Sequence, residues 1–149
     1  MIKIRYGLKS DLPLAYEAYK AVTPAENKEE SAKGFVRWLA TSDSTKKLVL
    51  VAEVDTEEAG MVVVSIGLHP YEYPPEFGFV DVIYVKKKFR DSGVAHELIS
   101  KGRDWLQQNR VPIVYGIHKL ANDKFWDLVS ETFPGIKKVA SMYQEKFIY

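Results

Sequence analysis

A cluster of positive charge followed by a glycine marks one short stretch of the chain as a candidate anion site. Lys86, Lys87, Lys88 and Arg90 place four cations within five residues, and Gly93 follows. A loop that leads into a helix offers unpaired backbone N–H groups and the positive end of the helix dipole, and both favour phosphate. A solvated turn or a nuclear-localisation signal would explain the charges alone. Their position between an apolar strand and an amphipathic helix favours a phosphate site.

The second residue that could do chemistry is Asp81, the only acid within the apolar run Phe79–Val85. Burial raises the pKa of a carboxyl group, and a carboxylate that titrates near neutrality is an effective general base. The two-residue period of a strand predicts that Asp81 shares a sheet face with Ile83. A base, acting directly or through a water, and a structural carboxylate paired with an arginine or a backbone group both fit this position.

Hydrophobic periodicity predicts an alternation of strands and helices in the order β-α-α-β-β-β-α-β-α-β. This order predicts a mixed, mostly antiparallel sheet with helices on both faces, in the α/β (α+β) class, with one parallel crossover before the last two strands. Asp55–Glu58 is a predicted hairpin turn, and Gly102 inside a helix indicates close packing. The predicted strands are Ile2–Tyr6, Leu48–Val54, Gly60–Ile66, Phe79–Val85, Pro112–Ile117 and Val139–Ile148, and the predicted helices are Leu12–Val22, Glu26–Leu39, Gly93–Asn109 and Asn122–Thr132.

The composition is that of an ordinary globular protein, and we expect the 149 residues to form a single domain, 1–149. With no cysteine, the chain has no thiol nucleophile and no thiolate metal site, and its three histidines are too scattered to predict a metal centre. A net charge of +1 argues against nucleic-acid binding. The absence of a signal peptide and of a long apolar run predicts a cytoplasmic protein with no membrane partner.

The stretch from Arg90 to Ala95, Arg-Asp-Ser-Gly-Val-Ala, fits the pattern Arg/Gln-x-x-Gly-x-Gly/Ala of the GCN5-related N-acetyltransferases. The predicted order of elements is also that of this family, so the chain resembles it over essentially its whole length. The resemblance implies the acyl-CoA N-acyltransferase fold. It further implies an enzyme that transfers an acetyl group from acetyl-CoA to a primary amine of a small molecule or peptide, by direct transfer in a ternary complex.

The same resemblance implies how acetyl-CoA would be held, with no metal. The pyrophosphate would lie on the loop, where Arg90 either pins the loop or pairs with a phosphate and the lysines suit the ribose phosphate. The pantetheine arm would run beside Phe79–Val85, where a backbone N–H would polarise the thioester carbonyl. Asn122 would contact the arm, cap the following helix, or do both. The implied cofactor-binding residues are Ile83, Tyr84, Val85, Arg90, Asp91, Ser92, Gly93, Val94, Ala95 and Asn122.

The resemblance is incomplete at the position of the proton donor. The family's usual tyrosine in the last helix falls on Val129 here, and Phe125-Trp126 replaces a small residue. Candidate substitutes are Tyr84, Tyr115 and Tyr143, of which we prefer Tyr143, and solvent could also protonate the thiolate. The missing tyrosine favours an alternative, a non-catalytic acyl-CoA-binding module of the same fold. A third interpretation is an interaction protein without a cofactor.

The acceptor pocket is expected between the two N-terminal helices, the loop from His69 to Glu76 and the end of the last strand. Tyr71 and Tyr73 of this loop, with His69 and Glu76, would bind a substrate ring or amine, and a rigid loop without a ligand fits equally well. The fold does not transmit the identity of the acceptor. The closing strand, Val139–Ile148, could pair across a homodimer.

Overall fold

The computed structural model of the chain describes residues 1–23, 26–69, 71, 73, 75–116, 123–133 and 135, with the backbone alone for 123–126. A five-stranded sheet in the order β1-β2-β3-β4-β5 lies at its centre, antiparallel except for the last pair. The parallel pair confirms the predicted crossover and the mixed sheet. The strands are β1 (Ile2–Tyr6), β2 (Lys47–Val54), β3 (Glu57–Leu68), β4 (Glu76–Val85) and β5 (Val114–Gly116).

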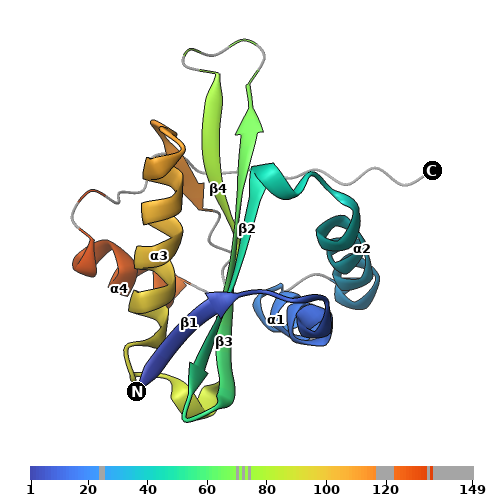
Figure 1. Cartoon of the computed structure of the whole chain (residues 1–149), viewed down its shortest axis with the longest axis vertical. Coiled ribbons are helices and arrows are strands. Elements are labelled where there is room, and N and C mark those ends of the chain that lie inside the picture. The colour runs from blue at the N-terminus through green and yellow to red at the C-terminus, as the bar shows by residue number, and fades with distance from the viewer. Residues whose placement is uncertain are drawn as a thin grey trace.

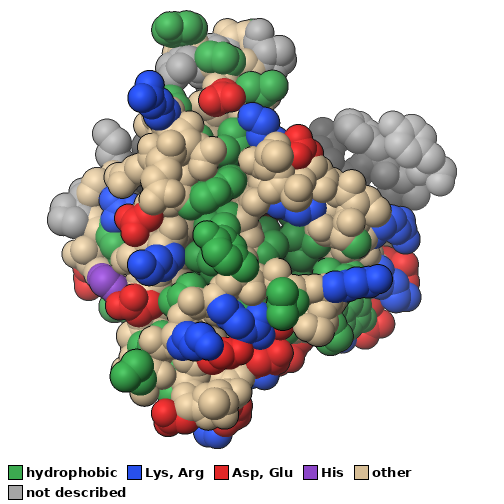
Figure 2. Space-filling model, viewed as in Figure 1, with side chains coloured by type: hydrophobic (Ala, Val, Ile, Leu, Met, Phe, Trp, Pro, Cys, Tyr) green, Lys and Arg blue, Asp and Glu red, His purple; other side chains and the backbone are tan. Residues whose placement is uncertain are grey.

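Helices cover both faces of this sheet. The pair α1 and α2 lies on one side, and α3 and α4 lie on the other (Figure 1). No helix in the described ranges has the length and apolar character needed to cross a bilayer. Figure 2 shows basic and acidic side chains interspersed over one face of the molecule. The helices are α1 (Leu12–Val22), α2 (Lys28–Thr41), α3 (Val94–Gln108) and α4 (Asp123–Thr132).

Alternate residues of β3 belong to two separate cores. Val62 and Val64 pack in a cluster with Leu98 of α3, whereas Met61 and Val63 pack in a second cluster with residues of α1 and α2. All of these side chains are buried. Because both faces are covered, the central strand is apolar throughout Met61–Val64 instead of alternating with polar residues.

The close approach of α3 to the sheet depends on Gly102. A Cβ atom at this position would lie 3.1 Å from Cγ2 of Val64. A larger residue would therefore push the helix away from β3. This contact confirms the close packing predicted from a glycine in the middle of a helix.

The β2–β3 hairpin turns on Asp55 and Thr56, whose φ angles are 49° and 71°. The type I′ turn, one of the two common two-residue hairpin turns, requires positive φ at both central residues, and its twist matches that of the strands. Val54 and Glu57 pair directly across the turn. The predicted hairpin is confirmed, but its turn is two residues long, and Glu57 and Glu58 belong to β3.

Lys47, at the start of β2, holds the C-terminal end of α2. Its ammonium group donates hydrogen bonds to the carbonyl of Leu39 (2.6 Å) and to the carbonyl and hydroxyl oxygens of Ser42 (3.0 and 2.6 Å). The last carbonyls of a helix have no partner within it, so a buried cation here satisfies them. Burial lowers the pKa of Lys47.

Arg5 of β1 joins the sheet to the segment before α1. Its guanidinium forms two hydrogen bonds with Asp11 (2.8 and 2.9 Å) and a third with Glu53 (2.5 Å). Asp11 also accepts the backbone N–H of Leu8 at 2.6 Å. Asp11 is the N-cap residue of α1, but its carboxylate makes no capping bond to that helix because these donors occupy it.

Several predicted boundaries differ from the structure. The helix predicted at Glu26–Leu39 begins and ends two residues later, and β5 is shorter than predicted. Among the residues of β4 only Gly78 and Val82 are fully buried, and the others are half-buried. Ile83, Tyr84 and Val85, at the C-terminal end of the strand, line a cavity. The predicted strand Val139–Ile148 lies outside the described residues.

Candidate active site

The loop between β4 and α3 presents backbone N–H groups at the start of a helix. Gly93 immediately precedes α3 with φ at +87°, a conformation that is strained for a residue with a Cβ atom. The first α-helical hydrogen bond runs from Glu97 N–H to the Gly93 carbonyl (3.1 Å). The preceding N–H groups of the first turn therefore have no partner within the helix and are available to an anion.

Two side chains hold this loop in place. Arg90 donates from Nε to the carbonyl of Val85 at 3.2 Å, and the hydroxyl of Ser92 donates to the carbonyl of Phe89. Of the two roles expected for Arg90, the structure shows the first, which pins the loop. Val94, the first residue of α3, is buried in the core, and its side chain anchors the start of the helix.

A cavity of about 770 Å³ lies above the loop. It is bounded by the end of β4, the loop, the first turns of α3, the end of α1 and one side of α4. Ser92 does not line it because its hydroxyl faces the Phe89 carbonyl, and Asn122 lies outside the described residues. The predicted cofactor-binding residues that line the cavity are Ile83, Tyr84, Val85, Arg90, Asp91, Gly93, Val94 and Ala95.

Sequence reasoning placed the N-terminal helices and Val129 of α4 near the site but did not identify four further residues of α1 and α4 that line the cavity. Ala21 and Val22 at the end of α1 line the cavity, as do Leu128 and Thr132 of α4. His96, on the first turn of α3, also lines it. The periodicity of each helix identifies its apolar face, but nothing in the sequence indicated that the end of α1 lies opposite α4.

The structure shows the surroundings of Val129, the position at which the family usually carries a tyrosine. Val129 lines the cavity, is buried, and packs with Ile99 and Phe133. His96 stacks on Phe133 with ring centroids 5.2 Å apart. Val129 itself packs on apolar side chains, and its own side chain is no proton donor.

Two of the three lysines that precede the loop form ion pairs with acids of β3. Lys86 forms an ion pair with Glu58 (3.5 Å), and Lys88 forms one with Glu57 (2.6 Å). The cause is the two-residue turn of the β2–β3 hairpin, which places both acids on β3 beside the end of β4. Lys87 is exposed and has no ion pair within the described ranges.

Asp81 lies at a β-bulge in β4. Val63 of β3 pairs with Val82, and the next residue, Val64, pairs with Val80, so Asp81 has no partner across the ladder. Val80 packs on the α3 face of the sheet and Val82 on the α1–α2 face. The extra residue thus shifts the alternation of faces along β4 by one.

This bulge overturns the prediction that Asp81 shares a face with Ile83. Ile83 packs on the α3 face, as does Val80, so the alternation of the strand directs Asp81, the residue after Val80, to the opposite face. Ser65, which opposes the rise in the pKa of Asp81, lies on that opposite face. Ser65 alternates with Met61 and Val63, which pack against α1 and α2. The carboxylate therefore belongs to the α1–α2 face.

The surroundings of Asp81 suit a base that works near neutral pH. Burial raises its pKa to about 6, and the hydrogen bonds from Ser65 and from its own backbone N–H oppose this increase. Oδ2 is buried, and no described residue hydrogen-bonds to it. No arginine in the described ranges pairs with the carboxylate, which argues against the purely structural role.

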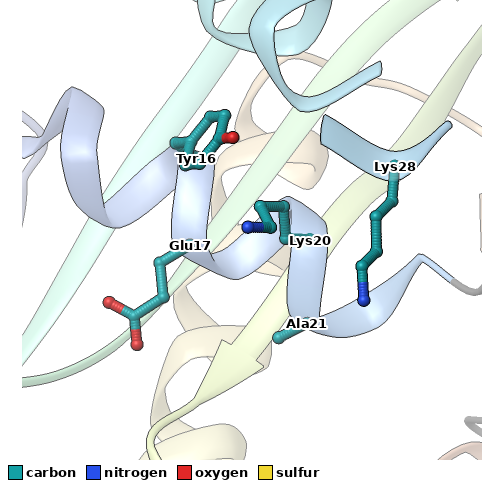
Figure 3. Close-up of a pocket in the computed structure, with 5 residues that line it drawn as sticks. All are labelled: Tyr16, Glu17, Lys20, Ala21 and Lys28. Carbon is teal, nitrogen blue, oxygen red and sulfur yellow. The ribbon is translucent and has the colours of Figure 1, made fainter. Parts of the chain in front are cut away.

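A hydrogen bond from Tyr84 to Glu17 separates the large cavity from a smaller one. The Tyr84 hydroxyl donates to Oε1 of Glu17 at 2.8 Å, and burial together with this bond raises the pKa of Tyr84. Tyr84 lines the large cavity, and Glu17 lines a cavity of about 380 Å³ between α1 and α2. Ala21 lines both. In Figure 3 the charged ends of Glu17, Lys20 and Lys28 point in different directions and do not converge on one ligand.

The loop expected to wall the acceptor pocket lies at the tip of the β3–β4 hairpin, which projects from the sheet (Figure 1). Tyr71 and Tyr73 are 83% and 97% exposed, and apolar side chains are visible at this tip in Figure 2. His69 stacks on Phe77 at 4.4 Å, and Glu76 forms an ion pair with Lys46 at 3.7 Å. None of the described residues of this loop lines either cavity.

Tyr115 and Tyr143 are the two remaining candidates for the proton donor. The ring of Tyr115, on β5, lies 5.9 Å from that of Phe77 in an edge-on contact and does not line either cavity. Tyr143 lies outside the described residues. In the described ranges, no group of three or more His, Asp or Glu side chains could hold a metal ion.

The sequence profile of the acetyltransferase (GNAT) family matches residues 12–128. The chain belongs to this acetyltransferase family. The match confirms the resemblance inferred from the loop and the element order, and with it the assignment to acyltransferases that use acetyl-CoA. No curated protein is similar enough in sequence to this acetyltransferase to count as a match.

Solved structures share its fold. The aminoglycoside antibiotic 6'-N-acetyltransferase of Acinetobacter haemolyticus is 21% identical, with a TM-score of 0.74 and 99% of each chain covered. Glucosamine-6-phosphate N-acetyltransferase of Arabidopsis thaliana is 18% identical, with a TM-score of 0.68 and the same coverage. A predicted acetyltransferase of Clostridium acetobutylicum with acetyl-CoA is 13% identical, with a TM-score of 0.73, covering 98% of this chain and 96% of its own. At these identities the similarity establishes the fold, the acyl-CoA N-acyltransferase fold that we expected.

Proposed function

We propose that this GNAT protein transfers an acetyl group from acetyl-CoA directly to a primary amine of a small molecule or peptide, with Asp81 as general base. The observation that carries the proposal is the combination of two features of β4. At its end, the strand leads into a helix N-terminus beneath a large cavity. In its middle, a buried carboxylate keeps one oxygen without a partner among the described residues.

The loop fits the phosphates of acetyl-CoA. Gly93 has no side chain, and a Cβ atom there would meet only Ile2 Cδ1, at 3.7 Å, so the approach to the backbone is open. The N–H groups of Gly93, Val94 and Ala95 would bind the pyrophosphate, and backbone groups of Ile83–Val85 would bind the pantetheine arm. When bound, acetyl-CoA supplies the activated acetyl group.

The acceptor must attack as a neutral amine, so a proton has to leave its nitrogen. A carboxylate with a pKa of about 6 is ionised at neutral pH and can take this proton directly or through a water. The departing thiolate must in turn gain a proton. Tyr84 is a poor candidate acid because its hydroxyl already donates to Glu17. Tyr143 and solvent therefore stay as the proposed proton sources.

The neighbouring structures support a small amine as acceptor, since their names specify aminoglycosides and glucosamine 6-phosphate. From these acceptors we extend to this protein only what they share, a primary amine on a polar small molecule. A peptide amine stays the second option for the acceptor. A cytoplasmic location and a homodimer formed through the closing strand stay proposals from the sequence.

The test is release of free thiol from acetyl-CoA in the presence of a panel of polyamines, amino acids, aminoglycosides and peptides. We expect release with at least one amine. Gly93→Glu should abolish it by placing a carboxylate where the phosphates bind. Gly135→Glu is the matched control, because Gly135 is exposed and a Cβ atom at this position would meet no other atom within 4 Å.

Asp81→Asn separates binding from chemistry. We expect turnover to fall by about two orders of magnitude or more, because general-base catalysis contributes about 10²–10⁴-fold. Affinity for CoA, measured by calorimetry, should be unchanged. Unchanged turnover would remove Asp81 from the role of base.

The alternative function, a non-catalytic acyl-CoA-binding module, is favoured by Val129. This side chain is 5% exposed and apolar where the family places a proton donor. Calorimetric binding of CoA without thiol release for any amine would support the module. Absence of CoA binding would contradict both functions.

A further inference from the structure

We propose that Glu17 is a specificity-determining residue, whose carboxylate binds a second positive charge on the acceptor and so selects diamines and polyamines. The inference rests on the proposed function, because it concerns the acceptor of that reaction. It deepens that function by naming the charge of the acceptor and the side chain of α1 that recognises it, which the loop motif does not indicate.

Glu17 lies at the wall between the two cavities. Its Oε1 accepts a hydrogen bond from the hydroxyl of Tyr84 at 2.8 Å, and Tyr84 lines the large cavity while Glu17 lines the small one. Ala21, one turn further along α1, lines both cavities. A ligand in the large cavity beside Tyr84 is therefore about one tyrosine side chain away from the Glu17 carboxylate.

The reacting end of the acceptor would lie on the same side of the sheet as Glu17. Tyr84 packs with the cluster formed by α1 and α2, and the alternation that begins at Val80 directs Asp81 to that face as well. Three residues of an extended strand span about 10 Å. An acceptor whose reacting amine lay beside Asp81 would therefore place the far end of a short chain near Glu17.

The carboxylate of Glu17 has no positively charged partner within the described ranges. Its hydrogen bond with Tyr84 joins it to a neutral group. Lys20, one turn further along α1, forms an ion pair with Glu29 at 3.4 Å. In Figure 3 the side chains of Glu17 and Lys28 point in different directions. No described lysine therefore offsets the negative charge of Glu17.

An ammonium group is the ligand that such a carboxylate recognises. Hydrogen bonds between charged groups are shorter and stronger than those between neutral groups. Tyr84 already holds the Glu17 carboxylate, so less conformational freedom is lost when an ammonium binds. A carboxylate or a phosphate at the far end of the acceptor would instead be repelled. The charge of this wall therefore distinguishes a diamine from an amino acid.

The test compares three series of acceptors matched in chain length, which are alkyl diamines from putrescine upward, alkyl monoamines and ω-amino acids. We expect the wild type to have its lowest KM with a diamine and its highest with an amino acid. In Glu17→Gln the KM of the best diamine should rise about tenfold, because a hydrogen bond between charged groups is lost. The kcat should be unchanged, because this interaction is the same in the ground state and the transition state. The KM of the monoamine and the affinity for CoA should also be unchanged.

Two further variants separate charge recognition from a structural role. Glu30→Gln removes an exposed acid of α2 that lines neither cavity, and it should match the wild type. Glu17→Lys should reverse the preference, so that the KM of the amino acid falls below that of the diamine. A residue that only tied α1 to β4 would change the KM of all three series alike.

Calorimetry makes the result independent of turnover. The best diamine should bind to the complex of the protein with CoA, and about tenfold more weakly in Glu17→Gln. A ratio of diamine to monoamine KM that is the same in Glu17→Gln as in the wild type would overturn the role of Glu17 while acetyl transfer to amines stands. A wild type that prefers the amino acids, or releases no thiol with any diamine, would overturn it too. Absence of thiol release with every amine of the wider panel would overturn the proposed function as well.

Discussion

The hydroxyl of Tyr84 on β4 lies 2.8 Å from a carboxylate oxygen of Glu17 on α1, and this hydrogen bond joins two elements 67 residues apart in the sequence. Tyr84 lines the large cavity and Glu17 lines the small one, so the bond forms part of the wall between them. A hydrogen bond that closes such a wall ties the position of α1 to that of β4. The bond therefore fixes the position of α1 relative to the end of β4 at the edge of the large cavity.

Replacement of Glu17 by glutamine should lower the pKa of Tyr84 relative to the wild type. Burial is the larger cause of the raised pKa and persists in the variant, whereas the contribution of the carboxylate is removed. NMR titration of labelled tyrosine, assigned with Tyr84→Phe, measures this change. A pKa equal to that of the wild type would show that the hydrogen bond is absent in solution.

Asp81→Asn should stabilise the protein at pH 8. The folded-state pKa of Asp81 is raised, so its contribution to stability is fully present below the unfolded pKa of 3.8 and is lost as the pH rises through about 6. A shift of about two pKa units corresponds to about 3 kcal/mol. Urea unfolding should show this gain at pH 8 and little gain at pH 4. Asp104→Asn, on an exposed part of α3, should give no such pH-dependent gain.

Arg5 and Asp11 should dominate the loss of stability in acid. The hydrogen bonds from Arg5 hold the pKa of Asp11 below its ordinary value, so the stabilisation is present above that value and is lost as the pH falls through the folded-state pKa. Asp11→Asn should therefore flatten the dependence of unfolding free energy on pH below about 4.

Arg5→Ala tests the same pair from the other side. It leaves the Asp11 carboxylate, which is 3% exposed, without its main partner, and we expect a loss of about 3 kcal/mol at pH 7. Lys33→Ala breaks the exposed Lys33–Glu30 ion pair and should cause no measurable loss in the same unfolding experiment. Equal effects of the two substitutions would contradict the structure at Arg5.

The features of the fold and the site that could be predicted from the sequence are those that depend on residues close together in the chain. The loop at Gly93 was predictable because a glycine before a helix and the charges around it are close in the chain. The bulge at Asp81 was not, since no glycine or proline marks it and only the register between β3 and β4 reveals it. The face of Asp81 was therefore predicted incorrectly.

The lysines before the loop show a second limit of prediction from the sequence. Their number and position were correctly read, but their partners Glu57 and Glu58 were assigned to a turn. The hairpin turn is two residues shorter than predicted, so both acids lie on a strand beside the lysines. Ion pairs between elements depend on such registers, and composition or charge spacing does not contain them.

Lys47→Met should destabilise the fold by about 1–3 kcal/mol. It keeps the aliphatic stem and removes the donors that satisfy the last carbonyls of α2, which are only partly accessible to water. Lys46→Met is the matched control, since Lys46 is its neighbour and makes only a 3.7 Å ion pair with Glu76. Thermal unfolding of both variants measures the difference, and a larger loss in Lys46→Met would contradict the capping role.

Glu57→Gln and Glu58→Gln should strengthen the binding of CoA. Each frees a lysine near the loop, and exposed ion pairs of this kind are worth about 0.2–1 kcal/mol, so an increase in affinity of up to about fivefold is expected. Calorimetry at two salt concentrations measures it. With CoA that lacks the ribose phosphate, the gain should disappear; a gain that persists would place the lysines away from that phosphate.

The unpaired residue in β4 has a consequence for anyone who redesigns this protein. A sequence chosen only for stability would remove the bulge and put an apolar residue at position 81, because each change favours a regular, apolar sheet. Such a protein would keep its cavity and the N–H groups before α3. Computational optimisation of the fold should therefore preserve the binding of the nucleotide and abolish turnover, unless position 81 is held fixed from the start.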